Sequence, residues 1–147
     1  MSLQDNLTTA MKEAMKAKDT LRLSTIRLVK TAVKNKEIEI GSALDDQAVI
    51  AVISTLVKQR RESAQVYRES ARVDLAEKEE QELLILQDFL PAQLDEAEIK
   101  GLIEEAVLET GAASMRDMGK VMKIVSAKTL GRADGRLVSE LVKARLA

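Results

Sequence analysis

The side chains that could do chemistry in this sequence are basic, and they gather near its end. From Arg116 onward the chain carries eight Lys or Arg residues against three acids. Lysine and arginine bind phosphate groups through charge-assisted hydrogen bonds, and no aromatic residue lies in this stretch to stack on bases. We therefore expect a surface that can follow the backbone of a polyanion through its phosphates, without stacking on bases. The candidates are Lys120, Lys123, Lys128, Arg132, Arg136 and Lys143.

The basic stretch also contains a glycine turn. Gly131 is well placed to end one helix in left-handed geometry, and Asp134 to cap the next. A turn that leads into a helix can bind phosphate through free backbone N–H groups, but the carboxylate of Asp134 would occupy those groups and repel the anion. The sequence thus favours a diffuse basic surface, with affinity that falls as salt rises. The alternative is that these charges form solvated helix faces that pair with acids elsewhere.

The composition gives little support to catalysis or metal binding. The chain has no cysteine and no histidine, which excludes serine–histidine and cysteine–histidine hydrolysis and any zinc site built from those ligands. It also lacks a P-loop, a paired-serine amidase signature and an acid cluster with evident metal spacing. We predict no catalytic residue, no cofactor, no metal and no enzymatic activity of the chain by itself.

The elements that must position the basic residues are predicted to be helices. Two aromatic residues, one proline and six glycines favour an all-α protein, because strands prefer aromatics and frequent turns need proline and glycine. An N-cap residue followed three positions later by an acid predicts helix starts at Asp74, Asp95 and Ser114, and Asp19 and Asp45 are further caps. The predicted helices span residues 3–17, 20–39, 46–71, 75–89, 96–109, 115–127 and 135–146.

The single proline indicates a domain boundary. Pro91 disfavours helical geometry at Leu90, so we predict an N-terminal helical bundle over residues 1–91 and a small three-helix tail domain over residues 92–147. In the tail, Lys120 and Lys123 lie off one apolar helix face and can reach solvent. That face is formed by Met118, Val121, Met122 and Val125.

Two basic features of the N-terminal part allow more than one interpretation. Arg60 points into the apolar side of its helix, where an arginine is unfavourable unless it is paired. We favour an ion pair with a carboxylate such as Glu62 or one on another helix, and the alternative is a contact with a protein partner. A basic row follows the preceding helix and is predicted to be a solvated face; it consists of Arg27, Lys30 and Lys34.

The sequence shows no membrane or secretion signal. Its first ten residues lack the long apolar region of a secretory signal, and no apolar run approaches the roughly 18 residues of a membrane span. We therefore expect a cytoplasmic protein that does not interact with membranes.

Several ordered motifs resemble the GatB/YqeY family. They are "VKQRRES" at 57–63, "DLAEKEEQELLILQDFLPAQL" at 74–94, "GA" at 111–112, "MGKVM" from Met118 and "GRADGRLV" from Gly131. The C-terminal part is similar to the tail domain of the GatB subunit of the aspartyl/glutamyl-tRNA amidotransferase, and the resemblance implies the same two-part helical fold. Two positions depart from the family pattern, because Lys123 stands where glycine is frequent and Ala127 where proline is common before lysine.

The resemblance implies a tRNA-binding or tRNA-associated accessory protein, since the related tail is understood to help hold tRNA away from the catalytic centre. An alternative is a component of glutamine-dependent amidotransferase, or carbon–nitrogen ligase, chemistry. The parent's kinase and amidase parts are absent from this sequence, so such a role would need partner proteins. The third hypothesis is a protein adaptor that uses the helix around Arg60.

Overall fold

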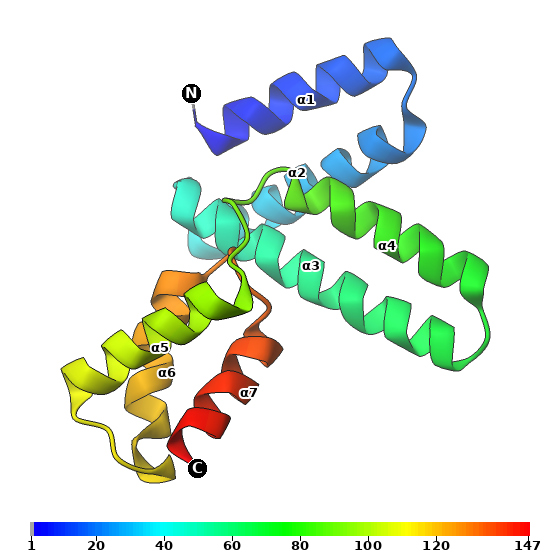
Figure 1. Cartoon of the computed structure of the whole chain (residues 1–147). Helices are drawn as coiled ribbons and strands as arrows, with labels where there is room; N and C mark the ends of the chain where they lie inside the picture. The colour runs from blue at the N-terminus through cyan, green and yellow to red at the C-terminus, as the bar shows by residue number, and fades with distance from the viewer. Residues whose placement is uncertain (1) are drawn as a thin grey trace. The chain divides into compact units, whose positions relative to one another are not determined.

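The computed structural model describes residues 2–147, which form seven α-helices and one short 3₁₀ helix with no strand (Figure 1). The prediction of an all-α fold is confirmed. The chain divides into two compact units, the first ending at Leu90 and the second spanning Pro91–Ala147. The elements are α1 (Leu3–Ala17), α2 (Thr20–Ile40), α3 (Asp46–Glu69), α4 (Val73–Gln87), α5 (Glu96–Thr110), the 3₁₀ helix η1 (Met115–Asp117), α6 (Met118–Thr129) and α7 (Gly135–Leu146).

The first unit packs α1–α4 around one apolar core, and α3 and α4 run antiparallel beside each other (Figure 1). The core follows from helical spacing, because apolar residues three or four positions apart line one side of a helix. The stripe of α3 illustrates this, with Val49, Ile53 and Val57 all buried. Such burial supplies most of the stability of helices in proteins. The core also contains Leu7, Ala10, Ile26, Val29, Val33, Leu44 and Leu86.

Two of the three helix caps predicted for this unit are present, and the one at α4 is not. Asp19 accepts a hydrogen bond from Arg22 N and Asp45 from Ala48 N, so both predicted caps are confirmed. The prediction of Asp74 as an N-cap is wrong, because α4 already begins at Val73 and has no side-chain cap. The α3–α4 connection is short and places Ala71 at a φ of 59°, which starts α4 early and leaves Asp74 in its first turn. An acid there still interacts favourably with the helix dipole.

Arg60 is part of an ion pair inside the first unit. Its Nε atom lies 2.8 Å from Glu82 Oε2 and 3.4 Å from Glu79 Oε2, and its side chain is only 16% exposed. The prediction of a structural ion pair is confirmed, and the partners come from α4. Glu62 is not among them because side chains two positions apart on a helix do not face each other. The pair explains why an arginine is tolerated on this side of α3.

Replacing Arg60 with alanine should lower the free energy of unfolding by about 2–3 kcal/mol, because two poorly exposed carboxylates would lose their partner. Urea unfolding of the full chain measures this change. Arg68→Ala is the matched control, since Arg68 binds Glu80 through two hydrogen bonds but both side chains are nearly half exposed. It should cause a much smaller loss. Equal losses for the two variants would contradict a structural role specific to Arg60.

The second unit packs α5, α6 and α7 around a separate core. The first turn of the helix predicted over residues 115–127 is tighter than an α-helical turn, because residues 115–117 form the 3₁₀ helix η1 and α6 starts only at Met118. The Ser114–Asp117 capping box is present and belongs to η1, so the predicted start at Ser114 is confirmed. The buried residues of this core are Ile99, Ile103, Ala106, Val107, Val121, Val125, Val138, Val142 and Leu146.

Candidate nucleic-acid interface

Lys120 and Lys123 lie on the outward face of α6. Successive residues of an α-helix are about 100° apart, so both lysines point away from the core of the second unit, and both are exposed. Across residues 2–147, neither of them forms an ion pair. The predicted apolar face behind them is confirmed, because its members are buried or pack against the core; they are Met118, Val121, Met122 and Val125.

Lys128 is placed differently from the other lysines of α6. Its Nζ atom lies 3.8 Å from Glu105 Oε2 on α5, so a carboxylate already balances its charge. Arg145 of α7 is held in the same way by Glu104, which accepts hydrogen bonds from its Nε and a second guanidinium nitrogen. The acids of α5 therefore neutralise part of the basic stretch. This agrees with the alternative that these charges form solvated helix faces paired with acids elsewhere.

Arg132 holds a turn together. Its backbone carbonyl accepts a hydrogen bond from Leu94 N at 2.7 Å, and its Nε donates to the carbonyl of Ala92 at 3.4 Å. Gln93 adds a bond from Nε2 to the carbonyl of Gly131 at 2.8 Å. Gly131 has a φ of 72°, which confirms the predicted left-handed end of the preceding helix. The turn after α6 thus binds residues 92–94, and part of the side chain of Arg132 is used inside the unit.

The cations of α7 are exposed but interspersed with an acid. Asp134 accepts a hydrogen bond from Arg136 N at 3.1 Å, so its predicted role as N-cap of α7 is confirmed. Arg136 and Lys143 are seven residues apart and share one helix face, and Glu140 lies between them on that face. Over the described part of the chain, neither basic side chain has an ion-pair partner. Four of the six candidates therefore have exposed side chains that form neither an ion pair nor a hydrogen bond within the unit, residues 91–147, namely Lys120, Lys123, Arg136 and Lys143.

Asp117 organises the entrance to α6. Its carboxylate accepts hydrogen bonds from Ala113 N at 2.9 Å and from Ser114 N at 3.4 Å. These two bonds, with a smaller contribution from the positive charge of Lys120, hold the pKa of Asp117 below its usual value of 3.8. A carboxylate at this position therefore fixes the turn that sets the start of the lysine-bearing helix.

The stabilising effect of Asp117 should depend on pH. A carboxyl whose pKa is lower in the folded state contributes stability above its unfolded value of 3.8 and loses it as the pH falls through the folded value. The Asp117→Asn variant should therefore melt below the wild type at neutral pH, and the difference should shrink in acid. Thermal melts across this range test the prediction, with Glu109→Gln as an exposed control in the same unit. A constant difference at every pH would contradict it.

Pairing of the cations with acids elsewhere is one of the two alternatives that the sequence leaves open, but the partners on α5 could not be named from it. The sequence carries one signal of this pairing, which is the local excess of acids over residues 95–110: this range contains six acids and only one lysine. Which cations these acids neutralise depends on how α5 packs against α6 and α7. The structure pairs Glu104 with Arg145 and Glu105 with Lys128, whereas Glu96 pairs with Lys100 within α5 itself.

Within residues 2–147, no group of three or more acids is arranged so that it could hold a metal ion. Over the same residues, no helix combines the length and the apolar character that a membrane crossing requires.

The structure thus defines an all-helical protein of two units, with an exposed lysine face on α6 of the second unit. The sequence profile described as Yqey-like protein matches residues 4–146. The chain belongs to the YqeY-like protein family.

Relatives of the chain share one name, Altered inheritance of mitochondria protein 41, mitochondrial. The relative from Lachancea thermotolerans is 33% identical over 141 residues, which are 90% of this chain and 75% of the relative. The relative from Vanderwaltozyma polyspora is 34% identical over 116 residues, or 74% and 62% of the two chains. For the relative from Kluyveromyces lactis the match is 41% over 83 residues, which are 56% of this chain and 45% of that protein.

The mitochondrial names of these relatives contradict the expectation of a cytoplasmic protein, which is wrong. The names of the relatives place those proteins in mitochondria, whereas the expectation relied only on the lack of a secretory signal and of a long apolar run. Neither feature distinguishes the cytoplasm from the interior of an organelle.

Proposed function

We propose that the chain is a tRNA-binding accessory protein that contacts tRNA through the exposed cations of its second unit. The observation that carries the proposal is the outward face of α6, where Lys120 and Lys123 are exposed and lack ion-pair partners. A core stripe on the opposite side of the helix fixes their direction. Arg136 and Lys143 on α7 supply further positive charge.

The placement of the charges matters more than their sum. Residues 91–147 contain nine Lys or Arg and nine Asp or Glu, so the unit as a whole does not attract a polyanion by net charge. Three of the nine basic residues pair with acids of α5. The unpaired ones provide a small number of phosphate contacts, and binding through such contacts is weak and sensitive to salt. No aromatic side chain of this unit could stack on bases, which favours binding by shape.

The resemblance of the tail to that of the GatB subunit supports tRNA as the nucleic acid. In that amidotransferase the tail is understood to help position tRNA, and the catalytic parts lie elsewhere. We therefore propose a role in holding tRNA for partner proteins rather than catalysis by this chain. The names of the mitochondrial relatives describe inheritance of the organelle and neither add to this role nor oppose it.

Binding of the purified full chain to folded tRNA in an electrophoretic mobility assay tests this function. If Lys120, Lys123, Arg136 and Lys143 each contact one phosphate, affinity should fall roughly 50- to 150-fold between 50 and 200 mM salt, because each phosphate contact releases bound counterions. The affinity should be similar for different tRNA species. Absence of a complex at the lowest salt, or affinity that does not change with salt, would contradict the proposal.

A further inference from the structure

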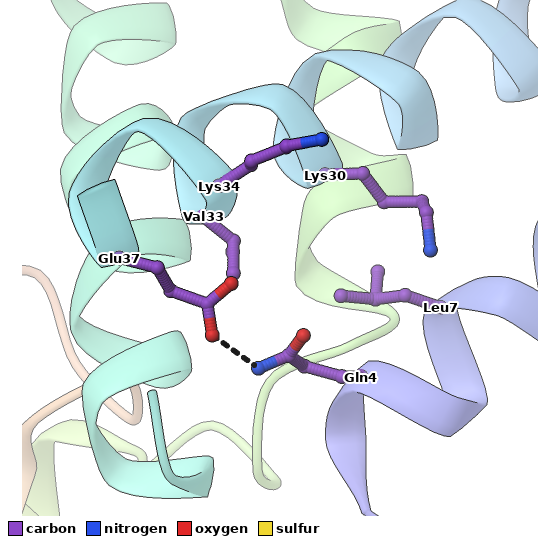
Figure 2. A pocket seen from close by; sticks show the side chains of 6 residues that line it. All are labelled: Gln4, Leu7, Lys30, Val33, Lys34 and Glu37. Atoms are coloured by element: carbon purple, nitrogen blue, oxygen red, sulfur yellow. Dashed lines mark hydrogen bonds between the residues drawn. The ribbon is translucent and has the colours of Figure 1, made fainter. Parts of the chain in front are cut away.

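The first unit contains a hollow between α1 and α2 that the proposed tRNA contact does not use. It has a volume of about 330 Å³ and is lined by Gln4 and Leu7 from α1 and by Lys30, Val33, Lys34 and Glu37 from α2. This volume is at the lower end of small-molecule sites in proteins. Figure 2 shows the lining side chains arranged around an open centre.

One side of the hollow carries positive charge without a counter-ion. Lys30 is half-buried, and its Nζ donates one hydrogen bond to Thr8 Oγ1 at 2.7 Å. In the part of the chain that the structure describes, no carboxylate forms an ion pair with Lys30 or Lys34. The two lysines are one helical turn apart, and like charges at that spacing destabilise a helix. An anion between them would remove this repulsion. We therefore interpret this part of the row as a site for a carboxylate or phosphate, in place of the solvated face that the sequence predicts.

The other side of the hollow carries hydrogen-bond acceptors. Glu37 Oε2 accepts from Leu44 N at 2.8 Å and from Gln4 Nε2 at 3.4 Å. Gln4 Nε2 also donates to the carbonyl of Leu44 at 3.0 Å, which fixes the orientation of the amide. Figure 2 shows the Gln4 carbonyl oxygen and the Glu37 carboxylate turned toward the open centre. Among the described residues, none donates a hydrogen bond to Gln4 Oε1 or Glu37 Oε1.

We propose that this hollow binds a small zwitterion of the α-amino-acid class. The ligand carboxylate lies between Lys30 and Lys34, and its ammonium donates to Glu37 and to the carbonyl of Gln4. Leu7 and Val33 close the floor of the hollow and are only 1% and 3% exposed, so the site holds the amino and carboxylate groups of the ligand and leaves its side chain toward solvent. Glu37 disfavours the backbone of a nucleic acid, which would bring phosphates beside a carboxylate. This inference concerns the first unit and stands independently of tRNA binding.

Nuclear magnetic resonance titration of the ¹⁵N-labelled full chain with L-leucine tests the proposal. Amide signals of Gln4, Leu7 and residues 30–37 should shift and saturate with a dissociation constant of about 1 mM or lower. N-acetyl-L-leucine lacks the ammonium and L-leucinol lacks the carboxylate. Each should bind at least about tenfold more weakly, because one end of the site would lose its partner. Inorganic phosphate is the probe for a simple anion site.

Lys34 is the residue to vary, because it is exposed and has no contact that holds the fold together. Lys34→Gln should weaken L-leucine binding about tenfold, and Lys34→Arg should retain most of it. Lys58→Gln removes an exposed lysine of α3 outside the hollow and should change nothing. Saturable shifts with this variant pattern support the proposal. No saturation with L-leucine, equal binding of phosphate or N-acetyl-L-leucine, or equal effects of Lys34→Gln and Lys58→Gln would overturn it.

Discussion

A fragment spanning residues 91–147 should be helical by circular dichroism and should lose this signal in one cooperative thermal transition. All nine buried residues of the core around α5–α7 belong to this unit. Its N-terminal segment is tied in place by hydrogen bonds from Gln93 and Leu94 to the turn at Gly131 and Arg132. A unit of this size is near the lower limit for independent folding, so these bonds should be kept in the fragment by starting it at Pro91.

A core variant provides the control for cooperative folding. Val125 is fully buried in the middle of α6, and Val125→Asp would place a carboxylate in an apolar core without a partner, which should abolish the transition. The exposed Lys123→Gln change should leave it nearly unaltered. If the unmodified fragment is a random coil at every temperature, the second unit depends on the first for folding, and residues 92–147 are not a domain.

Removal of three unpaired cations should weaken tRNA binding by roughly tenfold to a hundredfold at moderate salt, because each lost phosphate contact removes one counterion-release contribution. The variant combines Lys120→Gln, Lys123→Gln and Arg136→Gln. Arg132 is left intact because its guanidinium and carbonyl hold residues 92–94. The loss should be similar for different tRNA species, since no reading of bases is expected. Electrophoretic mobility at one fixed salt concentration measures it.

The structure provides a matched control with the same change in net charge. Lys100, Lys128 and Arg145 all pair with acids of α5, and replacing the three with glutamine also removes three positive charges. Their contribution to tRNA binding should be small, because their charges are already balanced. Circular dichroism should report folded protein for both variants, since exposed ion pairs contribute little to stability. Equal losses of affinity in the two variants would show that only net charge matters and would contradict a defined contact surface.

The helices of this chain could be predicted well from sequence because their boundaries depend on local interactions. The side chains of Asp19, Asp45 and Asp95 each accept a hydrogen bond from the backbone three residues on, and this spacing is visible in the sequence. The start of α4 was missed because the left-handed geometry of Ala71 sets it, and a non-glycine residue in that conformation carries no sequence signal.

The candidate site could be predicted only in part, because the partner of each charge depends on tertiary packing. The apolar stripe of α6 fixed the direction of Lys120 and Lys123, and this much follows from helical periodicity. Nothing local to Lys128 indicates that Glu105 of α5 will lie beside it. Similarly, the partners of Arg60 come from α4, and the hollow beside Lys30 exists only because α1 packs against α2.

The most direct test of tRNA contact through the second unit is the slope of log affinity for folded tRNA against log salt, measured for the wild-type chain and for the Lys120→Gln, Lys123→Gln, Arg136→Gln variant. If the three side chains each contact a phosphate, the slope of the variant should be shallower by roughly 2 to 3, because each contact contributes about 0.7 to 0.9. Equal slopes for the two proteins would mean that tRNA binds elsewhere on the chain and that these cations form a solvated face.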